Sequence, residues 1–276
     1  MKTAMSELWE QVDAMTRGRG FVDRSIDRKL AVRGADATGW LGDLVTADIA
    51  TLEPGTSRRS LLLSPTGRIR ADLLISRCDD GCFLVMQAID QREPAVELLS
   101  PYVLSSDVEL EDVSVQRAAL LLTERNEIVT AARGELSALE QDLLDRGFLK
   151  IDEPAHEAWR VGRGDARMGA DFDAGALPAE AGLEHAIDFE KGCFLGQESV
   201  AKVRNLGHPT TVLRHGWTHA DAQVGAPVRV TGDEVGFITS VAPRREGGLA
   251  LIARVNWGAT GRELSTGGFP VTPAAD

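Results

Sequence analysis

The most unusual segment of the chain is Lys191-Gly192-Cys193-Phe194-Leu195-Gly196-Gln197-Glu198. It combines an amine, a thiol, an amide and a carboxylate with two glycines, which permit tight backbone turns. A helix is expected to begin at Gly196, so Cys193 would lie just before a helix N-terminus, and Lys191 would add positive charge. Both features favour the thiolate, which is the reactive form of cysteine. The alternative is that Cys193 is a small apolar residue buried beside Phe194 and Leu195.

Four other segments complete a pattern with this one. They are Leu177-Pro178-Ala179-Glu180-Ala181-Gly182-Leu183-Glu184, Leu30-Ala31-Val32-Arg33-Gly34, Ser64-Pro65-Thr66-Gly67-Arg68-Ile69-Arg70-Ala71-Asp72-Leu73 and Val235-Gly236-Phe237-Ile238-Thr239-Ser240. Together with the eight residues around Cys193, they resemble the YgfZ branch of the glycine-cleavage T-protein (GcvT) superfamily. The agreement extends over nearly the whole chain.

This resemblance implies an α+β fold. Two interleaved GcvT-like folate-binding modules would occupy residues 1–206, and a C-terminal antiparallel β-barrel would occupy residues 207–276. The implied cofactor is tetrahydrofolate or a derivative, held in a central channel. The implied function is folate-linked support of the assembly or maintenance of iron–sulfur cluster enzymes. One of these is a radical enzyme that modifies tRNA, so the effect on tRNA modification would be indirect. The expected partners are folate and iron–sulfur enzymes or cluster-assembly proteins.

Residues 71 and 72 separate this sequence from the aminomethyltransferases of the superfamily. Those enzymes have a pair of acids where this chain has Ala71-Asp72, and the reacting carboxylate aligns with Ala71. A methyl group neither orients nor deprotonates a folate amine. Glycine-cleavage aminomethyl transfer is therefore not expected. Whether the protein is an enzyme stays open, and the alternatives are a folate-dependent aminomethyltransferase or demethylase and a non-catalytic interaction scaffold.

Three residues are candidates for holding folate. A pteridine needs paired hydrogen bonds, and its anionic glutamate tail suits an arginine fork. Arg160 matches the arginine of the superfamily's Arg-x-x-x-Gly segment, and the alternative is a surface arginine on a strand. Gln87 offers a donor and an acceptor to a pterin edge, and Asp72 can replace the missing acid by a small shift. The alternative for Gln87 and Asp72 is that each is an ordinary solvated side chain at the end of a strand.

The residues that flank Cys193 are candidates for orienting the thiol or a ligand. Cys193 and Lys191 form the expected reactive pair, and Gln197 and Glu198 are further candidates for binding the folate. In the first turn of a helix, polar and acidic side chains are also favoured for structural reasons alone.

Composition and charge narrow the class of protein. The 276 residues are 43% hydrophobic and 26% charged, as in ordinary globular chains, and the formal net charge is −12. This charge opposes general binding to nucleic acids or anionic membranes, so direct binding of either is not expected. No apolar run approaches the roughly 20 residues that cross a bilayer, and the first residues carry too many charges for an export signal. Three cysteines suit a reducing compartment, and we expect a cytoplasmic protein.

No metal site is expected within the chain. Cys78 and Cys82 bracket a hairpin turn and are expected to face one another, but two thiols are too few for a zinc or cluster site. The five histidines are scattered and complete no ligand set.

Hydrophobic periodicity, taken by itself, predicts α+β structure followed by a barrel. Helices are expected over residues 5–15, from 36 to 45 (with Asp36 as a side-chain cap), 94–103, 135–145 and 196–203. Strands are expected over residues 61–63, 69–76, 83–86, 108–115, 118–123, 211–218, 227–230, 234–241 and 249–257.

Overall fold

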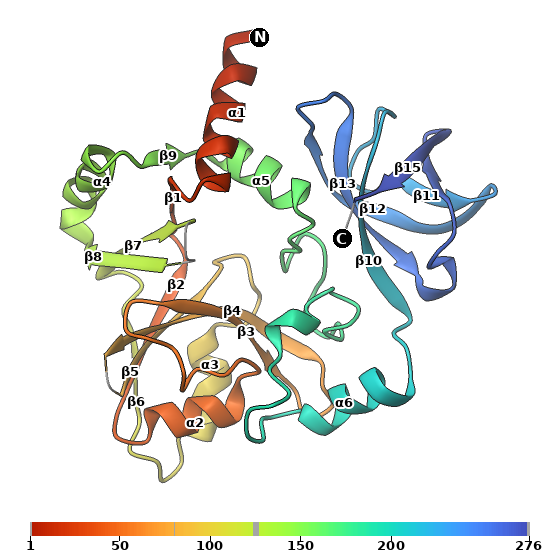
Figure 1. Ribbon diagram of the computed structural model, residues 1–276. Helices are drawn as coiled ribbons and strands as arrows, with labels where there is room; N and C mark the ends of the chain where they lie inside the picture. The colour runs from red at the N-terminus through yellow and green to blue at the C-terminus, as the bar shows by residue number, and fades with distance from the viewer. Residues whose placement is uncertain (1, 80, 124–126, 275–276) are drawn as a thin grey trace. The chain divides into compact units, whose positions relative to one another are not determined.

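The computed structural model describes residues 2–79, 81–123 and 127–274, and the chain divides into two compact units (Figure 1). The barrel unit comprises Met1–Val12, Glu153–Glu184 and Val200–Asp276. The sheet unit comprises Asp13–Asp152 and His185–Ser199. Helices α1 (Lys2–Thr16) and α6 (Gln197–Leu206) each contribute residues to both units.

Two sheets build the sheet unit. The larger sheet is antiparallel and consists of β2 (Arg28–Arg33), β3 (Ser57–Leu63), β4 (Ile69–Asp79), β5 (Cys82–Gln87) and β6 (Glu109–Asp112). Its spatial order is β3-β4-β5-β2-β6. The smaller sheet consists of β1 (Gly20–Asp23), β7 (Arg117–Leu122), β8 (Glu127–Ala132) and β9 (Leu149–Ile151). Its order is β8-β7-β1-β9, and β1 pairs with β9 in parallel.

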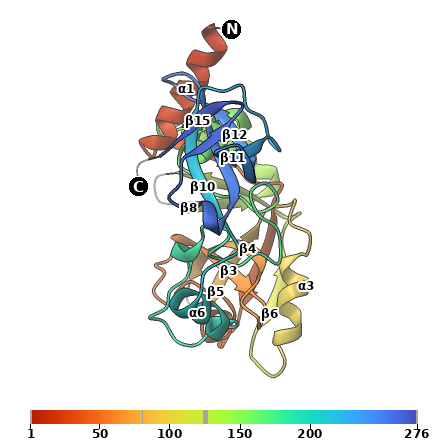
Figure 2. The same ribbon diagram turned by 90° about the vertical axis from the view of Figure 1, so that its right-hand side faces the viewer.

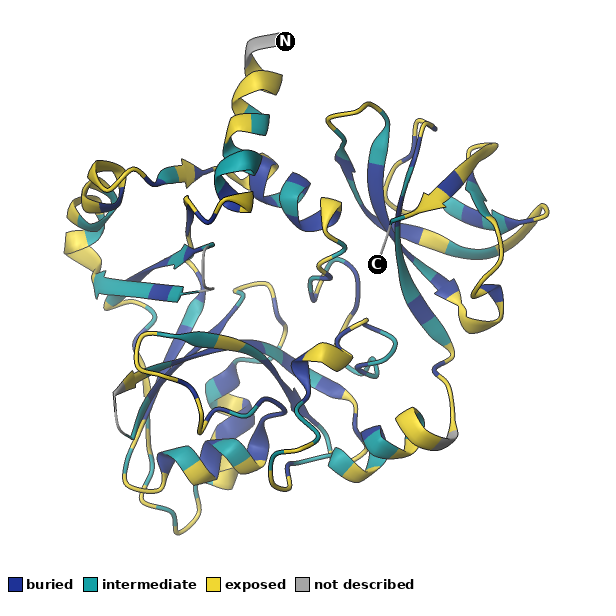
Figure 3. Ribbon diagram, viewed as in Figure 1, coloured by how far each residue is buried: buried dark blue, intermediate teal, exposed yellow. Residues whose placement is uncertain are grey.

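Apolar side chains cover both faces of the larger sheet. Helices α2 (Ala37–Leu44) and α3 (Ala95–Leu99), the latter continued by η1 (Ser100–Tyr102), pack on one face through Trp40, Leu41 and Leu98. The other face shares a core with the smaller sheet, where Leu84 and Ala119 meet. Strands β2 and β5 are therefore buried along most of their length (Figure 3), as strands covered on both faces are. The segment η2 (Arg133–Glu135) leads into α4 (Leu136–Asp145), which packs on the smaller sheet.

A closed antiparallel barrel forms most of the barrel unit. Its strands are β10 (Thr211–Thr218), β11 (Pro227–Val230), β12 (Asp233–Pro243), β13 (Leu249–Asn256), β14 (Leu264–Thr266) and β15 (Phe269–Pro273). The order around the barrel is β10-β13-β12-β11-β14-β15, and pairing of β15 with β10 closes it. Four of these strands, β10, β11, β12 and β15, are labelled in Figure 2. Val228, Ile238 and Leu251 lie in its apolar interior. Helix α5 (Glu153–Gly162) packs on its outer surface through Ala158 and Val161.

The predicted α+β architecture with a C-terminal antiparallel barrel is confirmed. The strands of the barrel begin at Thr211, and the predicted domain division at 206/207 stays a prediction. The expected helices and the β3-β4-β5 meander are present. In the described part of the chain, no helix is long and apolar enough to cross a membrane.

Two local expectations were wrong. Asp36 stands at the N-cap of α2 but makes no side-chain cap bond; its carboxylate accepts from the backbone N of Asp107 instead, at 2.8 Å. Cys78 and Cys82 do not face one another in register, because the register shifts between Arg77 and Asp79 and Cys82 is paired with Asp79. The turn of this hairpin includes residue 80, which lies outside the described residues.

Candidate functional site

The loop that carries Cys193 is fastened to the last turn of α2 and to the chain that follows it. The hydroxyl of Thr46 donates to the carbonyl oxygen of Ala186 at 2.8 Å, and the backbone N of Asp188 donates to the carbonyl oxygen of Thr46 at 2.9 Å. Beyond Cys193, the backbone N of Leu195 donates to the carbonyl oxygen of Asp43, also at 2.9 Å. These bonds hold the loop on both sides of the cysteine.

Lys191 strengthens the same attachment. Its ammonium group donates to the carbonyl oxygens of Gly42, Val45 and Ala47 at 2.7, 2.5 and 3.0 Å. The last carbonyls of a helix have no partner within the helix, so the lysine satisfies oxygens at and beyond the end of α2. Its nitrogen also lies 5.3 Å from the centroid of the Phe194 ring. The three donors of Lys191 are thus engaged by the backbone.

Burial lowers the pKa of Lys191 to about 8, and nearby Asp48, Asp188 and Asp43 act in the opposite direction by favouring the charged form. The amine is therefore mostly protonated at neutral pH. As a cation it also satisfies all three carbonyl oxygens, which a neutral amine with two N–H groups would not.

Gly196 brings the loop against the turn between β3 and β4. Its φ of +82° is the left-handed region, and a Cβ built at this position would lie 2.4 Å from the carbonyl oxygen of Ser64. One helical turn further, the hydroxyl of Ser199 donates to the carbonyl oxygen of Pro65 at 3.1 Å. Two of the sequence segments singled out above, 191–198 and 64–73, therefore meet in the sheet unit.

Cys193 itself is exposed, whereas the following Phe194 is buried. The alternative of a cysteine buried among apolar neighbours is therefore wrong. Gln197 begins α6, and its side-chain oxygen accepts from the backbone N of Phe194 at 3.4 Å. Glu198 is exposed in the first turn of α6, where a carboxylate favours the helix N-terminus.

Asp72 and Gln87 lie close together on the larger sheet. Both carboxylate oxygens of Asp72 accept from Arg59, at 2.9 and 2.6 Å, in a bidentate pair. Gln91 forms two hydrogen bonds with the backbone of Asp72, and its side-chain oxygen accepts from Gln87 at 3.3 Å. Gln91 and the pairing of Arg59 with Asp72 were not predicted, because neither residue stands in an unusual pattern.

Gln87 is buried, with 1% of its surface exposed. Its amide nitrogen donates to Gln91 and to the carbonyl oxygen of Glu93, and its oxygen accepts from the backbone N of Ala95 and from Arg28. Gln87 is thus satisfied by protein groups, and the alternative of a solvated side chain at a strand end is wrong.

Arg160 lies on helix α5 of the barrel unit, not on a strand, and 3% of its surface is exposed. Its guanidinium donates to Glu157 twice, at 2.9 and 2.5 Å, to Asp171 at 2.6 Å, to Ser240 at 2.8 Å and to the carbonyl oxygen of Asp165 at 2.7 Å. These bonds use all five N–H groups of an arginine.

Asp171 is the centre of this cluster and is fully buried. It also accepts from the hydroxyls of Thr239 and Ser240, at 2.6 and 2.7 Å. The hydrogen bonds and charges of Glu157 and Asp171 outweigh burial and raise the pKa of Arg160. The segment 235–240 and the Arg160 segment therefore meet within the barrel unit. Asp171 was not expected from the sequence, because an aspartate in a turn-rich stretch has many ordinary explanations.

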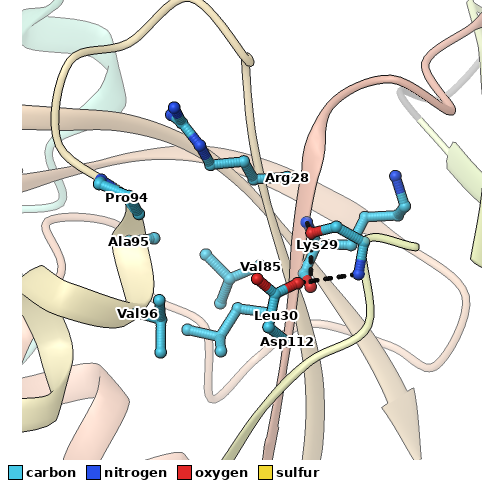
Figure 4. Close-up of a pocket in the computed structure, with 9 residues that line it drawn as sticks. Arg28, Lys29, Leu30, Val85, Pro94, Ala95, Val96 and Asp112 are labelled. Atoms are coloured by element: carbon cyan, nitrogen blue, oxygen red, sulfur yellow. Dashed lines mark hydrogen bonds between the residues drawn. The ribbon is translucent and has the colours of Figure 1, made fainter. Parts of the chain in front are cut away.

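The recess between β2, β5 and α3 is too small for an organic ligand (Figure 4). Leu30, Val85 and Val96 line it, and the side chain of Arg28 points away from these apolar groups. Its volume of about 10 Å³ is that of a single water. Among the residues that the structure describes, no group of three or more His, Cys, Asp or Glu side chains gathers as a metal site.

Comparisons with known proteins agree with this architecture. Residues 2–123 match the family model of the GCVT N-terminal domain. Aminomethyltransferase T of the glycine cleavage system from Bartonella henselae superposes with a TM-score of 0.79 at 19% sequence identity, over 96% of this chain and 88% of that one. The chain has a GcvT-like fold.

Two similar sequences carry different names. An aminomethyltransferase of Geobacillus kaustophilus is 26% identical over 327 aligned residues, which cover 96% of this chain and 87% of that protein. The mitochondrial iron-sulfur cluster assembly factor IBA57 homolog of Mycosarcoma maydis is 28% identical over 207 aligned residues, which cover 64% of this chain and 51% of that protein. These two sequence relatives of this chain therefore carry different names, aminomethyltransferase and iron-sulfur cluster assembly factor.

Proposed function

We propose that the protein is a YgfZ-type folate-binding protein that supports the assembly or maintenance of iron–sulfur cluster enzymes, and that Cys193 carries the activity. The observation behind this proposal is the exposed Cys193 on a loop whose backbone is fastened on both sides. The effect on tRNA modification would follow from a client iron–sulfur enzyme and would be indirect. We also keep the expectation of a cytoplasmic protein.

The fastening matters because a reactive group acts best when its position is fixed before its partner arrives. Phe194 anchors the loop in the core, Lys191 ties it to the end of α2, and Gly196 brings it against the turn at Ser64. Cys193 is left at the surface between these anchors. Thiolates are the usual protein ligands of iron–sulfur clusters, and one exposed thiol can contribute a single ligand at an interface with a client. Lys191 acts in this scheme as a positioning residue.

The residues expected to hold folate fit it only in part. Gln87 and Arg160 have their hydrogen-bonding groups occupied by the protein, so we assign neither of them to the folate. Asp72 keeps unused lone pairs beside Arg59, and its side chain is 13% exposed. Asp72, Gln197 and Glu198 remain the proposed folate contacts, and no chemical step is derived through the cofactor.

Aminomethyl transfer is the rival activity, since relatives with that name cover most of the chain. The side chain at the aligned position of the reacting acid is the buried methyl of Ala71. The neighbouring carboxylate of Asp72 is held by Arg59. These two features favour the role in iron–sulfur enzyme support.

The role of Cys193 can be tested in cells that lack the endogenous protein. We expect Cys193→Ala to lose the support of an iron–sulfur enzyme, measured as its specific activity, while circular dichroism and the unfolding midpoint stay unchanged. Cys78→Ala and Cys82→Ala are matched controls and should keep the activity. Equal loss in all three variants would contradict the assignment to Cys193.

Folate binding needs a separate measurement. Titration calorimetry with tetrahydrofolate should show binding to the unaltered protein and weaker binding to Asp72→Asn. The absence of binding at millimolar ligand would favour an interaction scaffold, and turnover of tetrahydrofolate with glycine-derived or methylated amines would favour a one-carbon transferase.

A further inference from the structure

A second concave site lies in the barrel unit, apart from the residues used above. It is a cavity of about 320 Å³ beside the C-terminal end of α6 and the first strand of the barrel. This volume lies at the lower end of the range of small-molecule sites, about 300–1,000 Å³. The lining includes Gly182 and Glu184 from the segment 177–184 that the sequence singled out and that the proposed function leaves unused.

The polar lining of this cavity is predominantly basic. Arg204 on the last turn of α6, Arg214 on β10 and His208 between them all line it, against the carboxylate of Glu184. The whole chain has a net charge of −12, so two arginines in one concavity are a local reversal of sign. A cleft of one charge concentrates ligands of the opposite charge.

One wall of the cavity contains a pair of stacked rings. The rings of His208 and Trp257 are nearly parallel, with an interplanar angle of 6° and centroids 5.2 Å apart. Hydrogen bonds hold both members of the pair in place. Nδ1 of His208 lies 3.0 Å from the carbonyl oxygen of Pro209, and the backbone N of Trp257 donates to the carbonyl oxygen of Thr210 at 2.9 Å. Trp257, which begins η4 (Trp257–Ala259), is nevertheless 38% exposed. A planar ligand can continue such a stack at little conformational cost.

We propose that this cavity binds a small molecule in which a planar aromatic ring carries an oxyanion, either a phosphate or a carboxylate. The ring stacks on the His208–Trp257 pair, and the oxyanion is bound by Arg214 and Arg204. Guanidinium groups bind both oxyanions through two parallel hydrogen bonds. The proposal is independent of folate and of Cys193, so its failure leaves the proposed function untouched.

The experiment is a titration of the full-length protein, labelled with ¹⁵N and followed by the indole N–H signals of its tryptophans. The probes are adenosine monophosphate, benzoate, adenosine and inorganic phosphate. We expect saturable shifts of the Trp257 signal with adenosine monophosphate or benzoate, and whichever binds more tightly identifies the oxyanion. Adenosine and inorganic phosphate, which each supply half of the ligand, should bind at least about tenfold more weakly than adenosine monophosphate.

Matched variants separate the cavity from general charge attraction. Arg214→Gln should weaken binding about tenfold or more, whereas Arg262→Gln, an exposed arginine outside the lining, should leave it unchanged. The two Trp257 variants lack the indole signal and are titrated by calorimetry instead; Trp257→Phe should keep most of the affinity, and Trp257→Ala should lose it. Equal loss in the two arginine variants, or no shift with any probe at millimolar concentration, would overturn the proposal.

Discussion

Replacing Arg160 by glutamine tests whether this residue holds the barrel unit together or binds a ligand. The substitution removes five donors from a cluster in which Asp171 is fully buried. Asp171 would keep its bonds to Thr239 and Ser240 but would lose the positive charge that balances it. Removing one partner of a buried ion pair costs about 3–5 kcal/mol of stability. We expect the free energy of unfolding to fall by this amount.

Urea denaturation followed by tryptophan fluorescence measures this loss. With a slope of about 2–3 kcal/mol per molar urea, the midpoint of unfolding should fall by about 1–2.5 M. Arg163→Gln is the control on the neighbouring surface; it removes a guanidinium 4.8 Å from the centroid of the Trp159 ring and should cost about 1 kcal/mol or less.

The result that refutes the structural role of Arg160 is specific. If Arg160→Gln were as stable as the Arg163 control while its affinity for tetrahydrofolate fell tenfold or more, Arg160 would be a ligand-binding arginine. A further check is a double-mutant cycle of Arg160→Gln with Asp171→Asn. The loss of unfolding free energy in the double variant should differ from the sum of the two single losses by at least about 1 kcal/mol.

Three other outcomes follow from the loop that carries Cys193. Gly196→Ala should lower the free energy of unfolding by about 2 kcal/mol or more, because φ is positive there and the new Cβ would lie 2.4 Å from the carbonyl oxygen of Ser64. A Cβ at Gly192 meets nothing within 4 Å, so Gly192→Ala should cost less than about 0.5 kcal/mol in the same denaturation assay. The pKa of Lys191 is about 8 in the folded protein and near 10.4 in the unfolded chain, which therefore binds the proton more tightly. Between these two pH values the free energy of unfolding should rise with pH. Lys191→Met should reduce this rise, measured as urea midpoints from about pH 7 to 10.5. Gly196→Ala should also reduce the support of an iron–sulfur enzyme more than Gly192→Ala does; equal effects of the two glycine variants would contradict the fastening of the loop.

Part of the fold could be read from local patterns. The apolar stripes of α1 and α2 and the turn residues of the β3-β4-β5 meander predicted elements that are present, because periodicity of 3.6 or 2 depends only on neighbours along the chain. Helix α5 and six strands were missed: β1, β2, β8, β9, β14 and β15. The missed strands have three to six residues and form by pairing with other strands of their sheets.

The candidate site was predicted in outline but not in its bonds. The segment around Cys193 stood out because its combination of glycines and chemical groups is rare. Lys191 was expected to act on the thiol, whereas in the structure its ammonium binds three carbonyl oxygens. Arg160 and Gln87 were expected to offer free hydrogen-bonding groups, and the structure occupies these groups with other residues.

The amino-acid sequence by itself determined the α+β class, many of the helices and strands, and the segment in which a thiol and two glycines come together. The tertiary structure alone decided which polar groups are already satisfied, that Cys193 is exposed beside a buried Phe194, and which distant segments meet. The physical reason is the distance along the chain over which each interaction acts. Helix and strand periodicity arises within a few residues, whereas hydrogen-bond partners such as Asp171 and Ser240, 69 positions apart, are chosen only when the chain is packed.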